Sequence, residues 1–186
     1  MSHIEDMVLN PTLIASVQVA RVDFIQAANH LSHAQSRWAP EGKWSISQIV
    51  EHIVRADQGM MVGTFRALED FRSGRGMRKT DNPHHGMSLE EILERTWKEP
   101  VKAPKVVEPA WGGPISFWLA QLAANQHTLE AFAILLGEED AEDMVFPHGI
   151  SGPVNVLQRI EFMRFHMDHH RHQIEAIKAM DGFPES

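Results

Sequence analysis

The chain contains no cysteine and no tyrosine. The absence of cysteine excludes disulfide bonds, thiolate-ligated metal sites and a cysteine nucleophile. The absence of tyrosine excludes a phenol as general acid. A metal ion would therefore have to be held by histidine, aspartate or glutamate. Because 12 of the 186 residues are histidine, imidazole is the expected ligand.

Long apolar runs are also missing. No stretch of about 18 apolar residues occurs, so we expect no transmembrane helix and no membrane partner. The N-terminal sequence MSHIEDMVLNP has neither the basic nor the apolar region of a signal peptide. These features predict a cytoplasmic protein.

Positive charge is scarce, with 17 lysine and arginine residues against 25 aspartate and glutamate residues and a formal net charge of −8. Nucleic acids attract proteins mainly through basic side chains, so we expect no nucleic-acid partner. One local exception is the basic stretch Arg72, Arg75, Arg78 and Lys79. It is typical of a solvated loop, and the alternative is an anchor for an anionic substrate.

Four long segments show the apolar spacing of amphipathic helices. The first covers about 12–38. The second begins at Ser45, which has capping-box spacing to Gln48, and continues to about residue 72. The third runs from about 114 to 137 and the fourth from 153 to about 180. No strand-like alternation of useful length competes with them. We therefore predict an all-α fold, a single-domain four-helix bundle over residues 1–186, with a long crossover between helices 2 and 3.

The crossover is an irregular insertion at about 73–113, rich in proline and glycine. Within it, Ser88 and Glu91 have capping-box spacing and predict a short helix to about Lys98. Connections longer than about 15 residues are often functional or mobile.

The fourth helix carries His166 and His170, one turn apart on the same face. His170 occupies a position in an apolar seam of alternating three- and four-residue steps: Val156, Ile160, Met163, Met167, His170, Ile174 and Ile177. His52 lies near the apolar stripe of the second helix. Three neutral histidines leave open positions on Zn²⁺ or Ni²⁺, so His52, His166 and His170 are candidate ligands. The alternative is that these rings are buried and bonded to carbonyl groups or water.

The other histidines are expected elsewhere. His169 and His172 point away from the pair and should face solvent or an interface. The residues expected to be exposed are His30, His33 and His127, and those expected in loops are His84, His85 and His148, of which His148 could reach a site. Gln173 either supports the site by hydrogen bonding or is an ordinary surface residue. Gly59 and Gly63 share a face with His52 and mark either close helix packing or a substrate cleft.

Two phrases resemble one known family. EGKWSISQIVEHI is similar to the entry of the second helix in the DinB-like (DinB/YfiT) superfamily, where a Trp-Ser pair precedes a histidine by about two turns. HMDHHRHQI resembles the last-helix motif of that family, a His-x3-His pair leading into Gly-Gln-Ile. Here His172 stands where the family often has glycine, and the segment 73–113 is long.

The resemblance implies an up-up-down-down four-helix bundle, often a homodimer, that binds Ni²⁺ or Zn²⁺ through His52, His166 and His170. Some relatives are metal-dependent S-transferases or isomerases that use low-molecular-weight thiols. It favours a divalent-metal-dependent enzyme acting on a small-molecule substrate, a thiol S-transferase or a hydrolase. One alternative is a non-catalytic metal- or ligand-binding stress-response protein, and another is a structural bundle. No catalytic residue besides the ligands is assigned.

Overall fold

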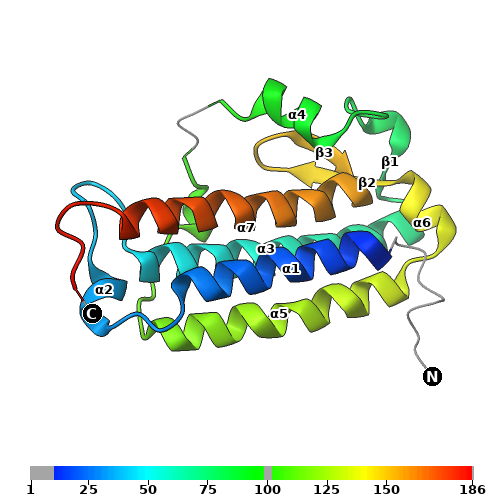
Figure 1. The fold of residues 1–186 in the computed structure, drawn as a ribbon. Coiled ribbons are helices and arrows are strands. Elements are labelled where there is room, and N and C mark those ends of the chain that lie inside the picture. The colour runs from blue at the N-terminus through cyan, green and yellow to red at the C-terminus, as the bar shows by residue number, and fades with distance from the viewer. Residues whose placement is uncertain (1–10, 99–101, 186) are drawn as a thin grey trace.

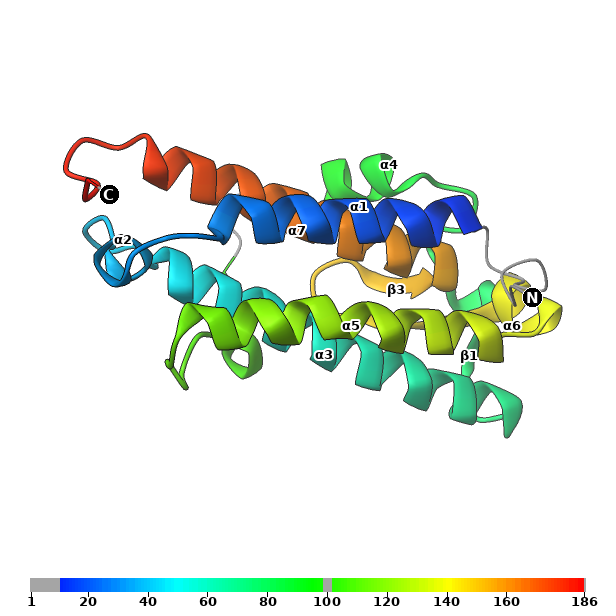
Figure 2. The same ribbon diagram turned by 60° about the horizontal axis from the view of Figure 1, so that its bottom comes forward.

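The structure, a computed structural model, describes residues 11–98 and 102–185. Four long helices dominate it: α1 (Pro11–Ala28), α3 (Ile46–Arg72), α5 (Ile115–Leu135) and α7 (Val156–Lys178). α1 packs against α5 and α7, and α3 packs against the same two helices, which closes a four-helix bundle (Figures 1 and 2). The predicted all-α class is confirmed, with a small sheet added to it.

The directions of the helices correct one expectation. α1 and α7 run one way along the bundle while α3 and α5 run the opposite way (Figure 1). The order is therefore up-down-down-up, and the up-up-down-down order implied by the resemblance is wrong. Because the parallel helices α3 and α5 are consecutive, the chain must return along the bundle between them, which explains the long crossover.

The first predicted helix, 12–38, is two helices in the structure. α1 ends at Ala28, and α2 (His33–Arg37) follows after a break. His30 has a φ of 58°, which a right-handed helix cannot accommodate, and its backbone N–H donates to Oδ1 of Asn29 at 2.9 Å. Ser32 then caps α2 with a complete capping box. Local side-chain bonds thus interrupt a pattern that periodicity alone reads as continuous.

The capping-box prediction for α3 is confirmed, since Ser45 and Gln48 make both reciprocal bonds. α7 begins later than predicted, at Val156, because Asn155 caps it through a box with Gln158. The predicted seam of α7 is buried along its whole length. His170 is 9% exposed in that seam, so its ring lies inside the bundle.

A three-stranded antiparallel sheet, β1-β2-β3, lies beside the start of α7 (Figure 1). β1 covers Met77–Arg78, β2 covers Met144–His148 and β3 covers Gly152–Asn155, and α6 (Glu138–Asp143) precedes β2. The sequence predicted a loop and the start of helix 4 here. The strands are too short to show alternation, and Pro147 faces Pro153 across the hairpin.

The crossover is a packed segment with short elements of its own: η1 (Lys79–Asp81), α4 (Leu89–Thr96) and η2 (Lys105–Val107). The Ser88–Glu91 capping box is present, and α4 ends two residues before the predicted Lys98. Gln158 of α7 donates to the carbonyl oxygens of His84 and Met87 at 2.9 and 3.0 Å. This part of the insertion is therefore fixed to the bundle. Among the described residues, no helix is long and apolar enough to cross a bilayer.

Candidate functional site

The three predicted ligands lie together between α3 and α7. One ligating atom from each of His52, His166 and His170 can be chosen so that all lie within 4.8 Å of one another. Nε2 of His52 is 3.3 Å from Nε2 of His166, and the ring centroids of His166 and His170 are 4.7 Å apart. We call these residues the three-histidine cluster. The antiparallel packing of α3 on α7 brings them together from positions more than 110 residues apart in sequence.

The rings of His52 and His170 are each oriented by a hydrogen bond on the side that faces away from the cluster. Nδ1 of His52 lies 2.9 Å from the carbonyl oxygen of Val107, and Nδ1 of His170 lies 2.8 Å from Oε1 of Gln173. An amide or carbonyl oxygen only accepts, so each Nδ1 carries the proton and each Nε2 keeps its lone pair. Gln173 thus has the supporting role that was one of its two expected roles.

Burial keeps the cluster neutral. It lowers the pKa of His166 well below the usual value of 6.5, and the neighbouring rings of His170 and His52 lower it further. Burial also lowers the pKa of His170 to about 3. The pKa of His52 is lowered by burial, although the bond to Val107 opposes that effect. Neutral imidazole is the form that binds metal, so the rings are ready at neutral pH.

The cluster geometry fits a metal ion. With Zn–N distances of about 2.0–2.1 Å, two nitrogens of a tetrahedral site lie about 3.3 Å apart. The separation between Nε2 of His52 and Nε2 of His166 is 3.3 Å. Apolar rings surround the cluster, with Trp44 5.1 Å from His52 and Phe162 stacked 5.7 Å from His166 between centroids. Such a shell restricts water and strengthens electrostatic interactions inside the site.

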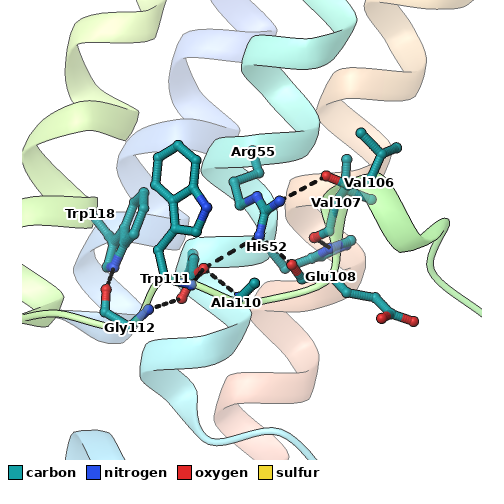
Figure 3. Close-up of polar contacts among 10 residues, drawn as sticks. His52, Arg55, Val106, Val107, Glu108, Ala110, Trp111, Gly112 and Trp118 are labelled. Carbon is teal, nitrogen blue, oxygen red and sulfur yellow. Dashed lines mark hydrogen bonds and ion pairs between the residues drawn. The ribbon is translucent and has the colours of Figure 1, made fainter.

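One part of the crossover closes a side of the site. We call residues 103–113 the strap. The carboxylate of Glu51 accepts from the backbone N–H groups of Ala110 and Trp111, both at 2.7 Å, and of Gly112 at 2.9 Å (Figure 3). Glu51 is one residue before His52, so α3 holds the strap beside the cluster. Burial alone would raise the pKa of Glu51, but the three N–H donors and Arg55 lower it overall.

Arg55 holds the other half of the strap. Its guanidinium donates to the carbonyl oxygen of Val106 at 2.9 Å and to that of Glu108, and it stacks over the ring of Trp111 at 5.2 Å (Figure 3). Glu51, His52 and Arg55 thus form one turn of α3 that binds six backbone groups and one ring of the strap. Through this turn the crossover contacts the site.

A cavity of about 780 Å³ opens from the cluster between α3, the strap, the β2–β3 loop and α7. Gly59 lines it, and a Cβ added there would meet no atom within 4 Å, which favours the cleft interpretation over close packing. Gly63 lines a separate cavity of about 290 Å³ next to β1 and β2. The two glycines therefore share a helix face but not a cavity.

Two further histidines line this cavity. His169 was expected to face solvent or an interface, but it is half-buried and packs against Trp97 at 5.6 Å between centroids. His148, at the end of β2, lies 4.2 Å from the ring of Phe162. The sequence offered one signal for His148, its place in a loop just before the ligand helix, but the hairpin that aims its ring was not predicted.

The remaining histidines and the basic stretch lie away from the cluster. His30, His33, His127 and His172 are exposed, as predicted. His84 is buried, with Nε2 2.7 Å from the carbonyl oxygen of Ser151. Arg72, Arg75 and Arg78 pair with Asp140, Asp70 and Asp143 respectively. These pairs occupy the arginines and favour a structural role over an anchor for a substrate.

Comparison with known proteins agrees with this architecture. The chain matches the family model of the DinB superfamily over residues 17–174, a span that includes the three-histidine cluster. Searches of curated proteins and of solved structures each find no significant match. The matched span covers most of the bundle and the whole candidate site, so the chain belongs to the DinB superfamily.

Proposed function

We propose that His52, His166 and His170 bind one divalent metal ion, Zn²⁺ or Ni²⁺, and that the protein is a metal-dependent enzyme acting on a small molecule. The observation that carries this proposal is the convergence of three neutral rings, two of them fixed through Nδ1 so that Nε2 faces the cluster. Three ligands leave coordination positions open, and the cavity of about 780 Å³ gives access to them.

The reaction that we propose is S-transfer from a low-molecular-weight thiol. A metal held by His52, His166 and His170 would lower the pKa of a thiol or water in its open position and so favour the anionic form near neutral pH. The sulfur lone pair forms the new bond to the electrophile, the leaving group departs with its bonding pair, and the thiol proton passes to solvent. The chain has no cysteine, so the sulfur must come from a cosubstrate. His169 lines the same cavity, so its imidazole is a candidate for relaying that proton.

Metal content tests the first half of the proposal. We expect near-stoichiometric metal by inductively coupled plasma mass spectrometry on tag-free protein, and its loss in His166→Ala/His170→Ala. The matched control is His127→Ala/His172→Ala, which removes two exposed histidines and should keep the metal. Protein that is purified without metal and refuses added Ni²⁺ and Zn²⁺ would remove the basis for the enzyme.

Turnover assays test the proposed S-transfer activity. Metal-loaded protein is assayed with bacillithiol, mycothiol, glutathione and coenzyme A against a panel of electrophiles, and with hydrolase substrates. Activity with one thiol, absent from the ligand double variant, is the expected result.

A second candidate is a non-catalytic metal- or ligand-binding stress protein. The absence of aspartate and glutamate among the described residues that line the cavity favours it, because no carboxylate base is at hand. Metal binding with silence across the panel would establish that alternative.

A further inference from the structure

The cavity beside the cluster has a charge opposite to that of the chain. Lys43, Arg55 and Arg159 line it, and none of its described lining residues is aspartate or glutamate. The whole chain carries a net charge of −8, so composition alone would favour acidic groups there. A cavity lined by positive charges without negative ones concentrates anions. The three cations are not equivalent, because Lys43 is exposed and Arg55 is committed to the strap.

Arg159 differs from both. No hydrogen bond or ion pair joins its guanidinium to another residue in the described part of the chain, and its Nε is shielded from solvent without a partner. Its guanidinium stacks over the ring of Phe146 at 5.3 Å. Burial lowers the pKa of Arg159 to about 10, so it remains charged at neutral pH. Arg159 also borders the smaller cavity, where the acid Asp70 already pairs with Arg75. A largely buried cation without a counter-ion is costly, which points to a ligand that supplies one.

His148 offers a second donor in the same cavity as Arg159. The backbone N–H of Ser151 donates to Nδ1 of His148 at 3.0 Å, so Nδ1 carries the lone pair and Nε2 carries the proton. Burial, with Arg159 nearby, lowers the pKa of His148 to about 3 and keeps the ring neutral. Among the described residues, Nε2–H has no hydrogen-bond partner. The ring of His148 packs on Phe162, which stacks on His166, and both His148 and Arg159 line the cavity of the cluster.

We propose that Arg159 and His148 form an anion subsite that binds the carboxylate of a small-molecule substrate in the cavity of the three-histidine cluster. One guanidinium and one neutral N–H carry a single positive charge, which matches a carboxylate better than a dianionic phosphate ester. Arg159 and His166 are seven residues apart on α7, about two turns or ~10 Å along the axis. The substrate therefore has several bonds between its carboxylate and the group directed at the cluster. The anion subsite itself does not depend on the proposed function. Only what the substrate group directed at the cluster does there rests on that function.

The test compares acids and alcohols of the same length. Mercaptoalkanoic acids with about two to six methylene groups, and the matching mercaptoalkanols, are titrated by calorimetry into Co²⁺-loaded wild-type protein. A charge-assisted bond to arginine should make the best acid about tenfold tighter than its alcohol. Arg159→Gln should reduce that ratio to about one and leave the affinity for the alcohol and the metal content unchanged. His148→Phe should lower the ratio by a smaller factor, since a neutral N–H donates a weaker bond.

Arg164→Gln is the matched control, because Arg164 is on the same helix, pairs with Asp168 and does not line the cavity. It should keep the preference for the acid. An acid that binds wild-type protein no more tightly than its alcohol, or does not bind at all, overturns the proposal whether or not any variant folds. A preference that survives in folded Arg159→Gln also overturns it. Hexanoate and hexanol are also titrated into metal-free protein. This comparison tests the anion subsite separately from the proposed metal-dependent function, because it applies even if the cluster binds no metal.

Discussion

The carbonyl oxygen of Val107 accepts a hydrogen bond from Nδ1 of His52 at 2.9 Å. The strap therefore orients one candidate ligand, while the two residues that flank His52 on the same turn of α3, Glu51 and Arg55, hold the strap in place. The strap and the cluster are thus mechanically linked. A change that loosens either one should be detectable in the other.

Glu51→Gln should release the strap. An amide has one acceptor oxygen, whereas the carboxylate accepts three N–H groups, so the variant should lose about 1–3 kcal/mol of unfolding free energy in urea. Hydrogen exchange at residues 110–112 should accelerate and metal affinity should fall. Glu69→Gln, an exposed change on α3, is the control and should do neither. Unchanged exchange at 110–112 would show that the three bonds do not hold the strap.

Gln173→Leu should weaken metal binding without unfolding the bundle. Removing the oxygen that accepts from Nδ1 of His170 frees the ring to rotate, and loss of such a support typically costs about 10–100-fold in affinity. Competition with a chromophoric chelator measures the change, and circular dichroism reports the helix content. The matched control is Gln18→Leu on the exposed side of α1. Equal metal affinity in the two variants would refute the supporting role.

Stability of the metal-free protein should fall as the pH is lowered. The pKa of His148 is about 3 in the folded protein because burial disfavours its charged form, and it returns to about 6.5 on unfolding. The unfolded chain then binds more protons, so stability is complete above pH ~6.5 and declines toward pH 3 at up to about 1.4 kcal/mol per pH unit for this group.

Urea unfolding at pH 7.5 and pH 5.0, in the presence of a chelator, measures this dependence. The loss should be at least about 2 kcal/mol for wild-type protein and smaller in His148→Phe. His172→Phe, at an exposed position on α7, should behave like wild type. The same slope in wild type and His148→Phe would mean that His148 does not stay neutral in the fold.

Gly59→Leu and Gly63→Leu form a matched pair. A Cβ added at either position meets no atom within 4 Å, so both changes should gain up to about 1 kcal/mol from helix propensity. Only Gly59 lines the cavity of the cluster, so only Gly59→Leu should weaken binding of the mercaptoalkanoic acids. Calorimetric titration of both variants decides the matter. Equal binding by both would show that the space beside Gly59 is not used by ligands.

Much of the fold could be read from local patterns. The boxes at Ser45 and Ser88 place the starts of α3 and α4, because their bonds span only three residues. The α7 seam predicts which face is buried, since helical periodicity is a local property. The same reasoning missed the break at His30 and the β2–β3 hairpin, where short-range hydrogen bonds and strand pairing override the apolar pattern.

The sequence by itself determined the candidate ligands and the bundle that carries them. The spacing of His166 and His170 fixes their common face, and the absence of cysteine leaves imidazole as the main donor. Only the tertiary structure decided that Val107 orients His52, that Glu51 and Arg55 hold the strap, and that Arg159 faces the cavity with His148. These contacts join residues 11 to 61 positions apart, and they depend on the path of the crossover and the hairpin, which no local periodicity encodes.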